Sequence, residues 1–215
     1  MDPALFIRRN TALAAPPLVP EILLHLATEL TPIWQASEET LARSALPPPF
    51  WAFAWAGGQA LARYLLDHPE VVRGRALLDF GAGSGLVAIA AAKAGAGPVT
   101  AAEIDHVAAA AIGLNAALNG VTVAVTASDL LDAPPQPWPV VTAGDVCYER
   151  PMAERATAWL RRLAVAGSLV LIGDPGRAYL PQAGLRELAR FQVPTSRELE
   201  DRDTRETTVW EVLPR

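Results

Sequence analysis

The sequence predicts an α/β fold in which helices cover both faces of a mostly parallel sheet. Three observations support this. Short apolar runs alternate with helix-like segments through most of the 215 residues, the runs end at glycines or other turn residues, and acidic residues follow several of the runs. Strands buried on both faces are continuously apolar in this way, whereas a sheet with one wet face alternates apolar and polar residues.

Residues 1–49 are expected to form an N-terminal helical extension or lid, and residues 50–215 a single α/β domain. One helix is expected near Glu21–Leu30, behind a proline-rich stretch. A triple-proline break precedes an aromatic segment, and Gly57–Asp67 then has leucines at helical spacing, which predicts the next helix.

The central part of the chain begins with the expected strand Ala76–Phe80, which ends in a glycine-rich turn. Gly85–Ala94 has the small residues of a closely packed helix and is stopped by glycines. Val99–Ala102 is a second apolar strand that ends at Glu103, and His106–Leu118 is a helix closed by an Asn-Gly pair.

The remaining elements follow the same alternation. They are expected as the strands Val121–Thr126, Val140–Ala143, Leu169–Ile172 and Thr207–Val212, with helices at Met152–Leu163 and Gly184–Arg190. The acids that follow strands are Glu103, Asp129, Asp145 and Asp174. Open α/β sheets bind ligands beyond the carboxyl ends of their strands, so these acids predict a ligand-binding edge.

The glycine turn reads Asp79-Phe80-Gly81-Ala82-Gly83-Ser84-Gly85. Glycines let a ligand approach the backbone closely, and the following helix offers unpaired N–H groups. The dinucleotide fingerprint would need its third glycine at position 86, which is Leu86. The turn therefore predicts a nucleotide-like ligand and disfavours NAD.

This spacing resembles motif I of class I (seven-β-strand), S-adenosylmethionine-dependent methyltransferases, which have a Rossmann-like fold. The resemblance implies S-adenosylmethionine as the methyl donor, with its methionine part in the turn (Gly81, Ala82, Gly83 and Gly85) and Asp79 near its ammonium. Glu103 is placed to accept both ribose hydroxyls. Asp105 is the alternative for that role, although capping of the next helix is favoured for it. Asp129 resembles the family's adenine contact.

Two further stretches narrow the resemblance. They are Pro47–Leu61, with the letters PPPFWAFAWAGGQAL, and Gly144-Asp145-Val146-Cys147-Tyr148-Glu149. Together with Gly173-Asp174-Pro175-Gly176-Arg177 they resemble the seven-strand protein lysine methyltransferases, closest to the family acting on the electron transfer flavoprotein β subunit. The resemblance implies that Trp55 and Gly144 border the donor pocket and that Asp145 and Tyr148 line the lysine channel. It also implies that flavoprotein subunit as the protein substrate.

Structural alternatives remain open for several of these residues. The aromatic residues of Phe50–Trp55 can simply anchor the N-terminal segment, and Tyr148 can be a packed residue. Asp174 and Arg177 can pair with each other or face the substrate. Cys147 is expected to be a small buried hydrophobe, because no histidine is placed to activate it.

Other functions also remain open. A small-molecule N-methyltransferase, resembling nicotinamide methylases, and a non-catalytic donor-binding module share this fold. The net charge of −5 and a single lysine, Lys93, disfavour nucleic-acid binding. The three histidines are far apart, so no metal site is expected. One cysteine and no signal peptide or membrane span predict a cytoplasmic protein. The arginine-and-alanine bias and the missing transit peptide suggest a bacterial source, and a mitochondrial location is expected if the source is eukaryotic.

Overall fold

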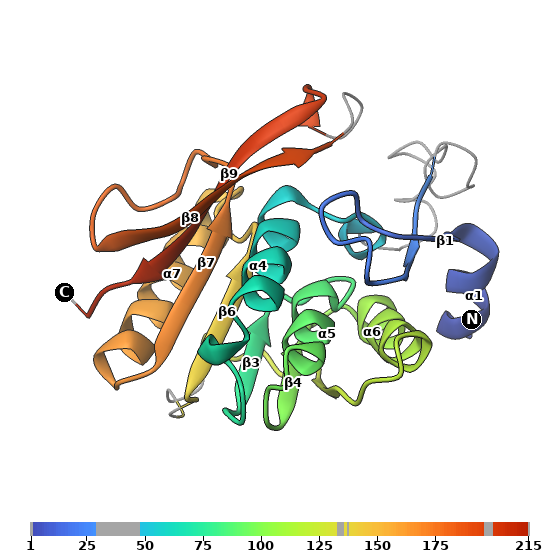
Figure 1. Cartoon of the computed structure of the whole chain (residues 1–215), viewed down its shortest axis with the longest axis horizontal. Coiled ribbons are helices and arrows are strands. Elements are labelled where there is room, and N and C mark those ends of the chain that lie inside the picture. Colours follow the sequence, from blue (N-terminus) through green and yellow to red (C-terminus); the bar gives the residue numbers. More distant parts are fainter. Residues whose placement is uncertain (1, 29–47, 133–135, 137, 196–199, 215) are drawn as a thin grey trace.

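The structure, a computed structural model, describes residues 2–28, 48–132, 136, 138–195 and 200–214. A seven-stranded sheet in the order β5-β4-β3-β6-β7-β9-β8 forms its centre (Figure 1). The strands are β3 (Leu77–Phe80), β4 (Val99–Ala102), β5 (Ala124–Thr126), β6 (Val140–Gly144), β7 (Leu169–Asp174), β8 (Leu185–Pro194) and β9 (Thr204–Val212). The first five in chain order are parallel, and β9 is antiparallel to both of its neighbours. This confirms the predicted class I methyltransferase fold.

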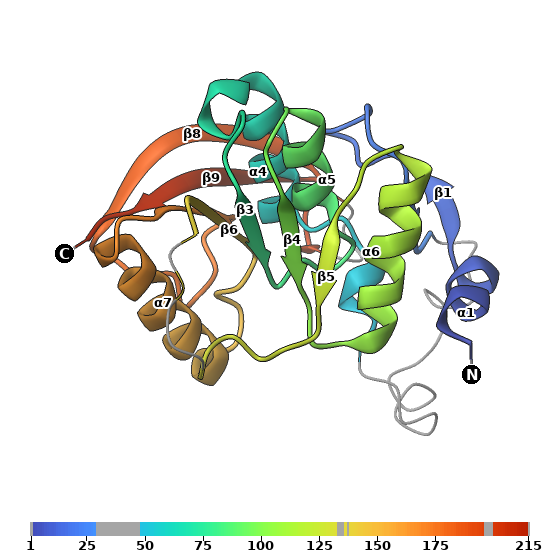
Figure 2. The ribbon, with the colours of Figure 1, turned by 90° about the horizontal axis from the view of Figure 1, so that it is seen from below.

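Helices cover both faces of the sheet, as predicted (Figures 1 and 2). The helices are α4 (Ala56–Asp67), α5 (Leu86–Lys93), α6 (His106–Leu118) and α7 (Arg150–Val165), with short 3₁₀ turns at η1 (Phe50–Ala52) and η2 (Pro69–Val71). Successive strand residues belong to different cores: Leu77 packs with α4 and α5, whereas Leu78 packs with α7. The continuously apolar strands follow from this double burial.

The N-terminal segment contains α1 (Pro3–Asn10), with Asp2 as its N-cap, and the antiparallel strands β1 (Ala12–Ala14) and β2 (Leu24–Leu26). It lies against α5 and α6. Ile7 is buried against α6, and the backbone N–H of His25 donates to Asn115 of that helix at 2.8 Å. The division into residues 1–49 and 50–215 stays a prediction, since residues 29–47 lie outside the described part.

Two predicted helices are wrong. The segment near Glu21–Leu30 contains strand β2 in its described part, because its backbone pairs with β1 and is bonded by α6 asparagines; positions 29 and 30 lie outside the described residues. Gly184–Arg190 instead falls in β8, which pairs with β9 across Leu185 and Val212 and contains a bulge between Glu187 and Ala189. Tertiary pairing with β9 overrides the local pattern of that short segment.

Candidate active site

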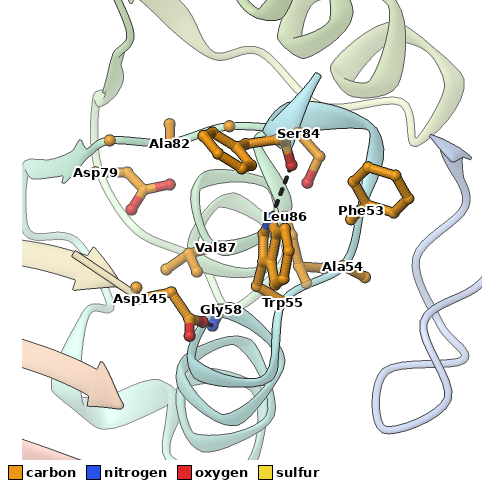
Figure 3. A pocket seen from close by; sticks show the side chains of 14 residues that line it. Phe53, Ala54, Trp55, Gly58, Asp79, Ala82, Ser84, Leu86, Val87 and Asp145 are labelled. Atoms are coloured by element: carbon orange, nitrogen blue, oxygen red, sulfur yellow. Dashed lines mark hydrogen bonds between the residues drawn. The ribbon is translucent and has the colours of Figure 1, made fainter. Parts of the chain in front are cut away.

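One pocket lies at the carboxyl ends of β3 and β6, where the order of the strands in the sheet reverses. The chain leaves β3 toward β4 and β5 on one side and returns to β6 on the other, so the ends of β3 and β6 enclose a crevice. The residues that line it are Phe50, Phe53, Ala54, Trp55, Gly58, Asp79, Gly81, Ala82, Gly83, Ser84, Leu86, Val87, Gly144 and Asp145. In Figure 3, Asp79 and Asp145 lie on one side of the pocket and Trp55 and Phe53 on the other.

The glycine turn forms the wall between β3 and α5. Gly81, Gly83 and Gly85 have φ angles of 65°, 53° and 81°, in the left-handed region that favours glycine. Gly81, Ala82 and Gly83 line the pocket as expected. Gly85 is not in the lining; it precedes α5 and lies against α6, where a β-carbon would stand 3.1 Å from Ile112. The close contact between position 85 and α6 therefore explains why this residue is glycine.

Asp79 is buried at the floor of the turn. Its Oδ1 accepts from the Thr142 hydroxyl at 2.9 Å and its Oδ2 from the Ala88 backbone N–H at 3.1 Å. The second bond caps the N-terminus of α5, whose own N-cap is a glycine. Burial raises the pKa of Asp79 to about 7, against the lowering effect of these two bonds. Two of its four acceptor positions remain for a ligand.

Glu103 and Asp129 lie outside the pocket lining. Glu103 reaches back to the glycine turn, since its Oε2 accepts from the Gly83 N–H at 2.9 Å, and its Oε1 accepts from the Asp105 N–H at 3.1 Å. Asp105 caps α6 through the Val107 N–H, as favoured from the sequence. Asp129 is half-exposed and accepts from the Leu131 N–H. The structure thus brings Glu103 to the turn but leaves Asp129 near the surface.

The aromatic residues of Phe50–Trp55 have two roles: one anchors the N-terminal segment and the others line the pocket. Trp51 is buried beside α1 and α6 and anchors the N-terminal segment. Phe50, Phe53 and Trp55 instead line the pocket, and the Trp55 indole donates to the Phe50 carbonyl at 2.8 Å. Tyr148 is 47% exposed and its ring centroid lies 5.7 Å from that of Phe50, so it stands beside the pocket without lining it.

Asp145 is buried at the end of β6 with a left-handed φ of 54°. Its Oδ2 accepts from the backbone N–H groups of Gly57 and Gly58, which are the second and third residues of α4. Its Oδ1 accepts from the guanidinium of Arg177 at 2.8 and 3.1 Å. Burial raises the pKa of Asp145 to about 6, although Arg177 opposes the rise.

Asp174 and Arg177 are bonded to each other, but through the Arg177 backbone, while the guanidinium pairs with other carboxylates. The Asp174 carboxylate accepts from the backbone N–H groups of Gly176 and Arg177, at 2.7 and 2.6 Å, and so shapes the turn after β7. The Arg177 guanidinium binds Asp145 and also Glu200, at 2.6 and 3.0 Å. Sequence reasoning missed Glu200, which has no motif and comes from the segment just before β9.

Four other pocket residues were not predicted as site residues. Gly58 and Ser84 lie inside the two motif stretches, and Leu86 and Val87 are the first two residues of α5. The hydrophobic periodicity of the sequence would have predicted that Leu86 and Val87 belong to the core.

The remaining expectations concern residues outside the pocket. Cys147 is buried, and burial raises the pKa of its thiol to about 12, which fits a packed hydrophobe. Trp138 packs against the core beside α7. The described part of the chain holds no group of three or more His, Cys, Asp or Glu side chains that could bind a metal ion. No helix among the described residues has the length and apolar character needed to cross a bilayer.

Comparisons with known proteins identify relatives of this chain. The model of the ribosomal protein L11 methyltransferase (PrmA) family matches residues 59–145. The chain is 38% identical to the electron transfer flavoprotein beta subunit lysine methyltransferase of Xenopus laevis, over 99% of this chain and 87% of that protein. It is 35% identical to the human protein of the same name, over 100% of this chain and 84% of that protein.

A solved structure shares the fold. Magnesium protoporphyrin IX methyltransferase from Synechocystis PCC 6803, with bound SAM, superposes with a TM-score of 0.54 and 19% identity over 73% of this chain and 77% of that chain.

Proposed function

Because the chain belongs to the family of electron transfer flavoprotein β subunit lysine methyltransferases, we propose that it methylates lysine in the β subunit of an electron transfer flavoprotein. The chain is an S-adenosylmethionine-dependent protein-lysine N-methyltransferase. The observation that carries the substrate proposal is the 38% identity over nearly the whole chain, which includes the pocket and the aromatic segment in front of it.

The pocket fits the methyl donor. Gly81 and Gly83 leave the backbone bare toward the pocket, so a ligand can approach their main chain. Asp79 keeps two acceptor positions that suit an ammonium group, and Trp55 offers an aromatic face to a sulfonium. We assign the ribose to Glu103 and keep Gly85, Asp129 and Gly144 as predicted donor contacts.

The acceptor lysine is proposed to enter beside Asp145 and Tyr148. A lysine side chain arrives protonated, with a pKa of about 10.4 in model peptides, and can attack only as the free amine. The ammonium first loses its proton to water. The amine nitrogen then forms a bond to the methyl carbon, while the carbon–sulfur bond breaks and its electron pair stays on sulfur, leaving S-adenosylhomocysteine. The protein contributes placement and orientation of the two reactants.

Mass spectrometry tests the substrate. The enzyme would be incubated with S-adenosylmethionine and purified electron transfer flavoprotein, and the β subunit digested and mapped. We expect mass increments of about 14 Da, one methylene equivalent per transfer, on lysine residues of that subunit. A Glu103→Gln enzyme serves as the control with a weakened donor site.

Radiolabelled donor and a whole-cell extract distinguish the other functions. Label in a small metabolite, with none in protein, would establish the small-molecule alternative instead. A lack of label in both fractions, with donor binding retained, would favour a non-catalytic module.

A further inference from the structure

The carboxylate of Asp145 has no acceptor position left for a substrate. A carboxylate has about four lone-pair positions. Gly57 and Gly58 donate to Oδ2, and the guanidinium of Arg177 donates twice to Oδ1. The residue lines the pocket, yet in this arrangement it offers an incoming lysine no free lone pair, and the adjacent guanidinium of Arg177 opposes its charge.

Arg177 is held firmly in this position. Glu200 accepts two bonds from its guanidinium, and Arg205 donates to Glu200 from behind at 3.2 Å. The side chain of Glu200 is 3% exposed, so the pair is shielded from water. Asp174 fixes the Arg177 backbone. The guanidinium carbon also lies 5.8 Å from the ring centroid of Trp55, which lines the pocket. The cation is therefore held behind two residues of the pocket wall, Asp145 and Trp55.

Resting on the methyltransferase function proposed above, we propose that Arg177 is a positioning residue that neutralises Asp145 and thereby keeps the pocket from holding the substrate lysine as an ammonium ion. A buried carboxylate next to an ammonium group favours the charged form and raises the pKa of the amine. Such a pair would bind lysine in the state that cannot attack. A neutralised carboxylate still shapes the channel and caps α4, but it leaves the amine free to lose its proton.

The other charges near Asp145 act in the opposite direction. Asp174 and Glu200 both raise the pKa of Asp145, and Arg177 is the cation that opposes them. Removal of Arg177 would leave the carboxylates of Asp145, Asp174 and Glu200 with Arg205, bound to Glu200, as the remaining cation of the cluster.

The test is the pH dependence of lysine methylation by Arg177→Gln, with electron transfer flavoprotein as substrate. The rising limb of kcat, which reports the free amine in the complex, is expected to move up by about one pH unit, which lowers kcat about 10-fold at pH 7.5. KM for the protein should not rise, because the ammonium form is then bound more tightly. Damage of a purely structural kind would lower kcat equally at every pH or raise KM, and either result overturns the proposal.

Two further variants separate charge from packing. Arg177→Lys keeps the charge, so it should restore the wild-type pH profile even though it lacks the two-pronged geometry. Arg186→Gln is the matched control, since Arg186 pairs with Glu211 and is 61% exposed; its profile should equal that of the wild type. An unshifted Arg177→Gln profile, or a shifted Arg186→Gln profile, contradicts the assignment.

Glu200→Gln decides the question if Arg177→Gln does not fold. This variant retains Arg177 but removes the competing charge of Glu200, so the guanidinium then opposes the charge of Asp145 alone. The rising limb of the kcat–pH profile should therefore move to lower pH. An upward shift or no shift counts against the proposal.

A measurement without substrate keeps this inference separate from the proposed function. Carbon-13 NMR titration of Asp145 should show a higher midpoint in Arg177→Gln than in the wild type, and an equal midpoint overturns the inference. Failure of the wild-type enzyme to label any protein would instead refute the proposed function.

Discussion

Gly57 of α4 and Gly173 of β7 meet backbone to backbone. A β-carbon added to either one would overlap the carbonyl oxygen of the other. Gly144 of β6 shows the same closeness, since its β-carbon would lie 3.0 Å from the Gly58 backbone. These contacts set α4 directly on the ends of two strands. They bring the first N–H groups of α4 within reach of Asp145, so the glycines determine the position of the acceptor side of the pocket.

A Gly173→Ala substitution is expected to destabilise the protein by about 1–3 kcal/mol or more, because the methyl group has no space and its neighbour is backbone. Gly113→Ala is the matched control. Gly113 lies inside α6 with nothing within 4 Å of its added β-carbon, so alanine should stabilise the helix by about 0.5–1 kcal/mol. Urea unfolding of both variants measures the difference, and similar free energies of unfolding for the two would contradict the packing argument.

The stability of the ligand-free protein should fall as pH rises from about 4 to above 7. Burial raises the folded-state pKa of Asp79 to about 7 from its ordinary value of 3.8, so the folded state binds more protons than the unfolded state within this window. Asp145 and Asp174, with raised pKa values as well, act in the same direction. Urea unfolding at pH 5 and pH 8 measures the slope. Asp79→Asn should flatten it, and an unchanged slope would show that Asp79 is ionised in the folded protein throughout.

Glu103→Gln is expected to weaken binding of S-adenosylmethionine about 10- to 100-fold. The reason is the loss of the charged hydrogen bonds to the ribose that we propose for Glu103, each of about 1.5–3 kcal/mol. Asp129→Asn should weaken it less, because Asp129 is half-exposed and water competes for its contacts. Isothermal titration calorimetry of the two variants gives the ranking. A larger loss for Asp129→Asn would reassign the dominant donor contact to the end of β5.

Asn115→Ala should lower both stability and donor affinity. This buried side chain joins the N-terminal segment to the glycine turn, because it accepts from the His25 N–H and donates to the Ser84 carbonyl, each at 2.8 Å. Its removal leaves both backbone groups unpaired, at a cost of about 1–3 kcal/mol. Thermal unfolding with and without S-adenosylmethionine measures both effects. A loss of stability with unchanged donor affinity would show that the turn holds its shape without this contact.

The sequence predicted correctly those helices and strands whose hydrophobic pattern and end signals lie within the segment itself. The helices after the glycine turn and after Glu103 are found within one residue of their expected bounds, and β4 is found at Val99–Ala102. The wrong predictions concern segments whose structure is set by residues far away in the sequence. β8 is a strand because it pairs with β9. β2 is a strand because it pairs with β1 and is hydrogen-bonded to α6.

The site divides in the same way. Asp79, Gly81 and Gly83 could be placed from one contiguous motif, and they line the pocket. Glu200 could not, because a single acidic residue in a polar stretch carries no periodic signal. Its position follows from the pairing of β7 with β9, which brings Glu200 to Arg177, 23 residues earlier in the chain.

The ion pair between Arg177 and Glu200 links one side of the pocket to the β9 side of the sheet. The glycine turn between β3 and α5 forms the proposed donor half of the pocket, and Asp145 belongs to the proposed acceptor half. The electrostatic character of the acceptor half depends on the β9 side of the sheet, through a chain of contacts from Arg205 to Glu200, Arg177 and Asp145. Substitutions beside β9 are therefore expected to change the charge next to Asp145, and with it the pH dependence of methylation, without direct contact with the glycine turn.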